Sequence, residues 1–377
     1  MLRVGTCAAA LAATLLWSAA VPAKENKQKQ IDNAQFTGAI GCRSSSCHGG
    51  AGPKRDQYTI WSRQDFHTRS FAILTSARSA RIAETVGGGE ASTNLRCTIC
   101  HSPFQTVASE RLASTAHTDE GVSCESCHGA AEPWLRGHTR ADWTYAMRVT
   151  AGMRDLRSLY VRANTCVACH QNIDNDLLKA GHPTMIFELD SQSINEPKHW
   201  QDEDPWIGPR AWLTGQSVAL REAAWKSRTN ASPSDDAQQT SLALAWLLAK
   251  VTTVESTLPK IFEPNTSDPG TLEKQADQLA RAAALWIPKV DQVMSMLRVL
   301  AETDSEFDRA RASGQTLLYR ARRLVLALDR LSAAMNQNEA SLKIDNDMNR
   351  LREHVRGSDV YDPRKFAEDL RSFRKQL

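Results

Sequence analysis

The stretch Cys97-Thr-Ile-Cys100-His101 decides how this 377-residue sequence is interpreted, because its pattern, Cys-x-x-Cys-His, recurs at residues 124–128 and 166–170. A longer version, Cys42-Arg-Ser-Ser-Ser-Cys47-His48, has four residues between its cysteines. Two thiols followed directly by an imidazole form the attachment motif of c-type haem, in which the histidine is the proximal iron ligand. The sequence therefore predicts four covalently attached c-type haems. The predicted attachment residues are Cys42, Cys47, Cys97, Cys100, Cys124, Cys127, Cys166 and Cys169, and the predicted proximal ligands are His48, His101, His128 and His170.

Three other uses of paired cysteines compete with this interpretation. Zinc sites combine two Cys-x-x-Cys units around one ion and do not require a histidine after each unit. Disulfides are expected in an exported chain, and Cys-x-x-Cys can be a redox dithiol, but neither explains why all four pairs end in histidine. At the first motif, where the loop is longer, a haem held by Cys47 alone is the alternative.

The first 23 residues predict an export signal. Arg3 supplies a positive charge, residues 7–17 are apolar apart from Thr14, and Val21-Pro-Ala23 is a small-residue cleavage site. A retained membrane anchor is less well supported, because the apolar run is shorter than the ~20 residues that a span requires. Cleavage after Ala23 would remove Cys7 and leave four cysteine pairs. We therefore expect a periplasmic protein without a membrane span.

Composition narrows the class of protein further. Apolar residues make up 41% of the chain and charged residues 24%, which excludes a disordered chain, a collagen-like repeat and an integral membrane protein. The formal net charge is +3, from 46 basic and 43 acidic residues, and this balance gives no sign of a nucleic-acid partner.

Six histidines remain for the distal side of the irons. Five of them lie at residues 67–199, among the attachment motifs, whereas His354 stands apart and is expected to be structural. This supply suffices for four bis-histidine haems, although it does not require that every iron takes a second histidine. The candidate distal ligands are His67, His117, His138, His182 and His199.

The chain is expected to be mainly α and to contain two domains after the signal. Residues 24–208 would form a tetrahaem cytochrome c domain of short helices and loops, and residues 209–377 a helical bundle with a structural or docking role. Apolar positions recur at helical spacing in the bundle, and Pro288 should kink or divide its third helix. The expected helices are Ala211–Arg228, Asp236–Leu258, Leu272–Ala301, Glu306–Met335, Glu339–Val355 and Pro363–Leu377.

The motifs also carry a resemblance to a known family. The stretch Gly121-Val-Ser-Cys-Glu-Ser-Cys-His-Gly129, with Trp134 and His138 after it, resembles the third haem segment of the tetrahaem cytochrome c that accepts electrons from hydroxylamine oxidoreductase. Residues 180–183, 187–189, 197–200 and 212–216 resemble a broader set of exported multihaem c-type cytochromes. The likeness covers residues 38–225.

This resemblance implies haems in closely stacked pairs, mostly bis-histidine, that pass electrons between proteins. It implies that His138 reaches the first haem and that His67, which follows Trp61, serves the third. His182 would be an axial ligand of the second or the fourth iron. Larger relatives carry further attachment motifs in their helical region, whereas this chain has none there.

Three functions follow as hypotheses. The first is a periplasmic electron carrier between redox partner proteins, with no catalytic residues. The second is an enzyme that acts on nitric oxide, hydroxylamine or nitrite at a five-coordinate haem, for which the His101 site is the candidate. The third is a haem-bearing subunit of a larger redox complex or oligomer, docked through its helical domain.

Overall fold

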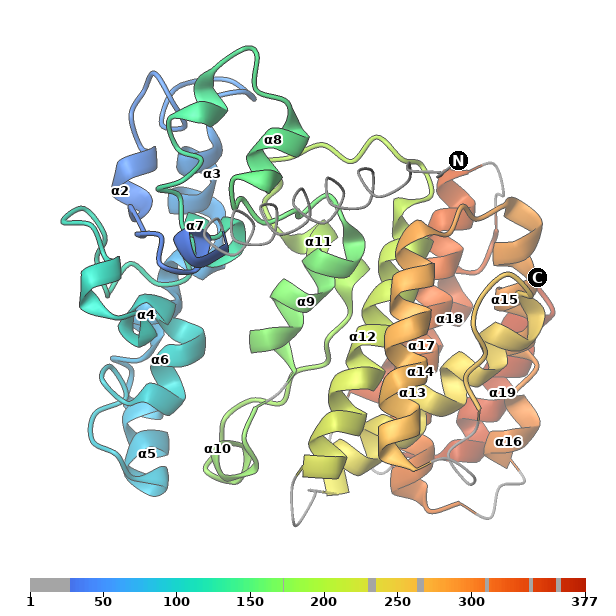
Figure 1. The fold of residues 1–377 in the computed structure, drawn as a ribbon. Coiled ribbons are helices and arrows are strands. Elements are labelled where there is room, and N and C mark those ends of the chain that lie inside the picture. Colours follow the sequence, from blue (N-terminus) through green and yellow to red (C-terminus); the bar gives the residue numbers. More distant parts are fainter. Residues whose placement is uncertain are drawn as a thin grey trace, which may run out of the picture. The chain divides into compact units, whose positions relative to one another are not determined.

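The computed structural model describes residues 28–171, 173–229, 235–262, 268–308, 312–338, 342–356 and 361–377 (Figure 1). These residues are mainly helical and contain no β-strand, which confirms the predicted mainly-α class. An isolated parallel bridge joins Phe36 to Leu112. The predicted export signal, including Cys7, lies outside the described residues. Within the described ranges, we find no helix with the length and apolar character needed to cross a membrane.

The chain forms two compact units, one that ends at Asp155 and one that begins at Leu156. The boundary expected near residue 208 does not coincide with this division. The reason is that α9 (Leu159–His170) and α11 (Leu189–Asn195) both pack against α12 (Ile207–Thr229). The fourth attachment motif, which ends α9, therefore belongs to the second unit.

The first unit consists of short helices joined by loops. Side chains at the helix starts satisfy backbone N–H groups that have no partner within the helix; Ser76, for example, accepts a hydrogen bond from the N–H of Ser79 at 3.2 Å. The elements are α2 (Ala39–Cys42), α3 (Gln57–Gln64), η1 (Phe66–Arg69), α4 (Ser70–Ile73), α5 (Ala77–Val86), α6 (Leu95–His101), η2 (Pro103–Thr106), η3 (Ser109–Arg111), α7 (Cys124–His128), η4 (Gly137–Thr139) and α8 (Tyr145–Thr150).

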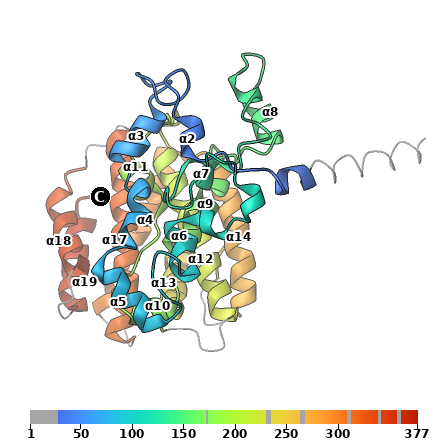
Figure 2. The same cartoon turned by 90° about the vertical axis from the view of Figure 1, so that its left-hand side faces the viewer.

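The second unit is a helical bundle with a large apolar core. Trp212 on α12 and Trp246 on α13 are fully buried in it. Figure 2 shows α18 and α19 beside α17, and the three helices are in contact. The remaining elements are α10 (Asn175–Lys179), α13 (Asp235–Val254), α14 (Pro269–Leu285), α15 (Val290–Ala301), α16 (Asp304–Asp308), α17 (Gly314–Gln337), α18 (Asp345–Arg356) and α19 (Pro363–Arg374).

Two of the expected bundle helices are divided. The third separates into α14 and α15 at residues 286–289, as Pro288 predicted. The fourth was expected to run through residues 306–335, but it separates into α16 and α17. Ser313 causes the second start, because its hydroxyl accepts a hydrogen bond from the N–H of Thr316 at 3.2 Å and so caps α17.

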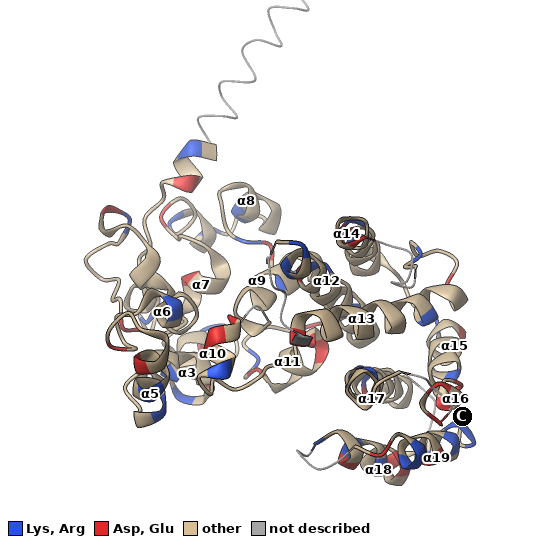
Figure 3. Cartoon of the chain, turned by 90° about the horizontal axis from the view of Figure 1, so that it is seen from below, with Lys and Arg blue, Asp and Glu red and all other residues tan. Residues whose placement is uncertain are grey.

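Both acidic and basic residues lie along α18 and α19 (Figure 3). Two of the basic residues on α19 form ion pairs with Asp304 on α16: Arg371 at 2.8 Å and Arg374 at 2.7 Å. These charges therefore join two helices of the same unit.

Candidate haem-binding sites

Three of the four attachment motifs lie on helices. The second motif ends α6, the third forms α7 and the fourth ends α9. In a helix, residues i, i+3 and i+4 project from one face. The two cysteines and the histidine of each regular motif occupy these positions, so one helical turn presents two thiols and an imidazole together, as covalent haem attachment requires.

The first motif achieves the same closure with a turn. Its longer loop folds back on itself: the N–H of Cys47 donates to the carbonyl of Ser44 at 2.9 Å, and the N–H of His48 donates to the carbonyl of Cys42 at 3.3 Å. The four intervening residues are therefore taken up within the turn, and the backbones at the two ends of the motif remain in contact. This geometry is compatible with use of the motif for attachment.

The proximal histidines hold polar partners at Nδ1. Nδ1 of His48 lies 2.9 Å from the side-chain oxygen of Gln57, Nδ1 of His101 lies 3.1 Å from the carbonyl oxygen of Ser70, and Nδ1 of His170 lies 3.3 Å from the amide of Gln192. Histidines that bind metals commonly use their second nitrogen in this way, which fixes the ring and its tautomer. With Nδ1 donating to these oxygens, His48 and His101 would present Nε2 for coordination. Nδ1 of His170 instead faces the amide nitrogen of Gln192, which is a donor, so this contact does not select Nε2.

His138 lies opposite His48. The ring centroids are 6.1 Å apart and the ring planes differ by 17°. Two imidazoles bonded through ~2 Å bonds to opposite sides of one metal ion would place their centroids about 6 Å apart. Nδ1 of His138 is hydrogen-bonded to the carbonyl of Leu135, and burial lowers the pKa of His138, which favours the neutral imidazole that binds metals. The pair fits a bis-histidine first haem.

His67 lies next to the chain that leads into the third motif. Its carbonyl accepts a hydrogen bond from the N–H of Val122 at 3.2 Å. The indole N–H of Trp61 donates to the carbonyl of the same Val122 at 3.0 Å. The segment containing Trp61 and His67 is thus fastened two residues before Cys124, where the resemblance places a ligand of the third haem.

Ser70 connects three of these segments. Its hydroxyl lies 2.7 Å from the carbonyl oxygen of His67 and 2.9 Å from that of His101, and it accepts a hydrogen bond from the N–H of Val122 at 2.9 Å. One side chain therefore brings together a distal candidate, the second proximal histidine and the start of the third motif. No pattern in the sequence indicates this role, because serine is common in loops.

Glu125, inside the third motif, anchors the chain that enters the first motif. Its side chain is buried and accepts hydrogen bonds from the N–H groups of Thr37 at 3.0 Å, Gly38 at 2.6 Å and Ala131 at 2.6 Å. Burial raises the pKa of Glu125. A nearby carboxylate, Glu120, accepts from the N–H of Ala39 at 3.1 Å. The sequence showed a glutamate at this position but no signal of its partners.

The first and third motifs meet at their first cysteines. The thiols of Cys42 and Cys124 are close enough to interact, and this interaction lowers the pKa of Cys42 and raises that of Cys124. Two porphyrins attached at these sulfurs would be neighbours.

Four large apolar side chains on η1, α4 and α6 of the first unit are exposed. Porphyrin rings attached at the motifs could cover them. The residues are Phe66, Ile73, Leu95 and Ile99, each more than half exposed.

The other histidines have varied surroundings. His117 is exposed, and Nδ1 of His182 lies 2.9 Å from the carbonyl oxygen of Pro183. The ring of His199 packs edge-on against Trp200. The distal roles of these three residues stay predictions. His354 differs, because its Nε2 lies 2.8 Å from the carboxylate of Asp369, which agrees with a structural role.

Residues 42–129 match the model of the family described as cytochrome c554 and c-prime. The matched segment contains the first three attachment motifs. No curated protein and no solved structure matches the chain. The family match supports a multihaem c-type cytochrome with covalently bound haem, in electron transfer.

Proposed function

We propose that this chain is a periplasmic tetrahaem c-type cytochrome that carries electrons between redox partner proteins. The family match supports the c-type haem, and the four motifs support the number. When bound, c-type haem supplies an iron that gains and loses one electron. The residues of the chain determine how many irons are held, with which ligands, and how close together.

The observation that carries this proposal is the pairing of His48 with His138. An imidazole on each side of an iron bound here would leave it no coordination position for a substrate, as expected for a carrier. The hydrogen bonds of Nδ1 to Gln57 and Leu135 orient both rings and support their basicity. The ligands are therefore held in place before and after a change of oxidation state.

The contact between Cys42 and Cys124 supports transfer between sites. Glu125 fixes the backbone at Thr37 and Gly38, close to Cys42, and it lies in the same helical turn as Cys124. The two attachment points are thus held by one buried carboxylate. This arrangement favours two cofactors that exchange electrons directly over two isolated ones.

Mass and spectra of the purified, haem-loaded protein test the proposal. We expect the mass of residues 24–377 plus four haems, and the loss of one haem when Cys42 and Cys47 are both changed to Ala. His138→Met and His67→Met should each alter one low-spin haem, because each removes a nitrogen donor from one iron. Gln28→Ala, at an exposed position outside the motifs, is the control.

Other outcomes would favour the competing functions. A high-spin haem that binds carbon monoxide in the unaltered protein would indicate an open iron and favour an enzyme acting on a small nitrogen compound. Stable co-purification with a redox enzyme would favour a subunit of a larger complex. Three haems, with a haem count unaffected by changing Cys42 and Cys47, would show that the first motif does not hold a haem.

A further inference from the structure

The histidines of the first unit differ in the group that faces Nδ1. His48, His101 and His138 each face a neutral carbonyl oxygen, from Gln57, Ser70 and Leu135. His67 instead faces a carboxylate: its Nδ1 lies 3.0 Å from Oδ1 of Asp65. The charge of its Nδ1 partner therefore distinguishes His67 from these three histidines.

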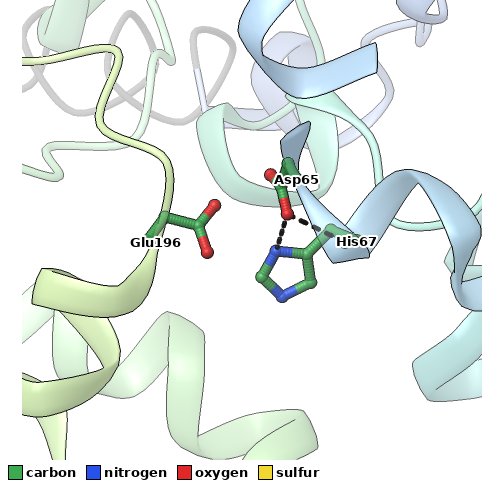
Figure 4. A group of neighbouring side chains, drawn as sticks. All are labelled: Asp65, His67 and Glu196. Carbon is green, nitrogen blue, oxygen red and sulfur yellow. Dashed lines mark hydrogen bonds and ion pairs between the residues drawn. The ribbon is translucent and has the colours of Figure 1, made fainter. Parts of the chain in front are cut away.

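Asp65 is held rigidly in this position. Its side chain is only 6% exposed, and Oδ1 also accepts the backbone N–H of His67 at 2.8 Å, which caps η1 (Figure 4). The ring is oriented so that Nε2 lies on the side away from Asp65 (Figure 4). The same oxygen therefore fixes both the backbone and the ring of His67, and it presents the far nitrogen for coordination.

A carboxylate acts on a ligand histidine differently from a carbonyl. A negative acceptor at Nδ1 makes the imidazole a stronger donor at Nε2, and hydrogen bonds that involve an ionised group are about twice as strong as neutral ones. Because Asp65 is buried, water screens its charge little. Both effects stabilise the more positive, oxidised state of an iron bound at Nε2.

We infer that Asp65 is a positioning residue that sets a low reduction potential at the iron bound by His67. This inference rests on the proposed function, since it requires that His67 ligates a haem. The site of His67 is then harder to reduce than the site of His48 and His138, whose Nδ1 partners are both neutral. A difference in potential is thus built into the neighbouring first and third sites.

Asp65→Asn in the haem-loaded protein is the sharpest test. Asparagine keeps an oxygen that can cap η1 and accept from Nδ1, but it removes the charge. We expect the reduction equilibrium constant of one haem to rise about tenfold, which is 59 mV for a one-electron couple. Spectroelectrochemical titration measures all the potentials, and electron paramagnetic resonance checks that the haem stays low-spin.

The reciprocal variant uses the other site. Gln57→Glu places a carboxylate at Nδ1 of His48 and should lower the reduction equilibrium constant of a different haem. Asp142→Asn is the matched control, because Asp142 is exposed and pairs with Arg140 rather than with a histidine; it should leave every potential in place. Asp65→Glu, which keeps the negative charge, should leave the potential closer to its original value than Asp65→Asn does.

Two results would overturn the inference. One is a full set of haems with unchanged potentials in Asp65→Asn; the other is an equal shift of all haems, which would reflect general charge rather than the contact with His67. Loss of the low-spin signal in both Asp65→Asn and Asp65→Glu would also overturn it, because Asp65 would then serve only to hold the fold. A protein without haem would instead refute the proposed function.

Discussion

Among the described residues of the first unit, Leu74, Ala83, Ala91 and Cys97 form a small cluster of buried apolar residues, whereas the apolar cluster of the second unit extends through the bundle from Leu159 to Phe373. The first unit is held instead by hydrogen bonds between side chains and distant backbone, as at Glu125 and Ser70. A domain with so small an apolar core usually needs disulfides or a bound metal group for stability. The two units therefore derive their stability from different sources.

The largest effect should follow from loss of haem attachment. Changing Cys97, Cys100, Cys124 and Cys127 to Ala removes the anchors of the second and third haems. We expect the first unit to lose its folded structure, because its exposed apolar residues lack a cover, while the second unit stays folded on its own core. Limited proteolysis should cleave before Asp155 and leave a fragment close to residues 156–377.

The unaltered, haem-loaded chain is the control for that experiment, and it should resist cleavage in both units. Equal resistance of the first unit to proteolysis with and without haem attachment would contradict its dependence on haem for stability. Equal sensitivity of both units would contradict the comparison as well, because the core of the second unit would then depend on the first.

The second prediction concerns pH and a buried carboxyl in the second unit. Burial, with a contribution from Glu188, raises the pKa of Asp190 to about 6. Arg330, 3.7 Å away, opposes this shift. Between pH 4 and pH 6, Asp190 is therefore largely protonated in the folded state and largely ionised in the unfolded state. Within this window the free energy of unfolding should fall as pH rises, by about 1.4 kcal/mol per unit and ~3 kcal/mol at most.

Asp190→Asn should remove this dependence, since the amide does not titrate. Denaturant unfolding of the haem-loaded protein at pH 4, 5, 6 and 7, followed by tryptophan fluorescence, measures it. Asp142→Asn, at an exposed position of the first unit, is the control and should keep the original slope. An unchanged slope in Asp190→Asn would show that other groups cause it.

Many helices of the second unit could be predicted from the sequence, because apolar residues at helical spacing indicate amphipathic helices. The division at Pro288 followed from its missing N–H. The unit boundary could not be predicted in this way. It depends on α9 and α11 packing against α12, and no local pattern shows which helix will cover a neighbouring face.

The residues of the candidate site likewise separate into those that the sequence predicts and those that only the structure shows. The attachment cysteines and proximal histidines were proposed from spacing, and three of the four motifs lie within the segment that matches the cytochrome family. The roles of Asp65, Ser70 and Glu125 were not proposed. Glu125 reaches backbone that is 87 and 88 residues away in sequence, so only the folded chain brings these groups together.

The smallest expected effect concerns a close approach between α11 and α12 at Gly215. A Cβ added at Gly215 would lie 2.6 Å from Cβ of Leu189 and 3.0 Å from its backbone nitrogen. Gly215→Ala should gain up to ~1 kcal/mol of helix propensity but cost about 1–3 kcal/mol through overpacking. We therefore expect a net destabilisation of about 1 kcal/mol, measured by thermal unfolding. Gly314→Ala, where the new Cβ meets no atom within 4 Å, should leave the second unit as stable as before or slightly more stable. A Gly215→Ala protein as stable as Gly314→Ala would show that α11 can move away from α12 without loss, and that the second unit is less tightly packed at the start of its bundle than its core implies.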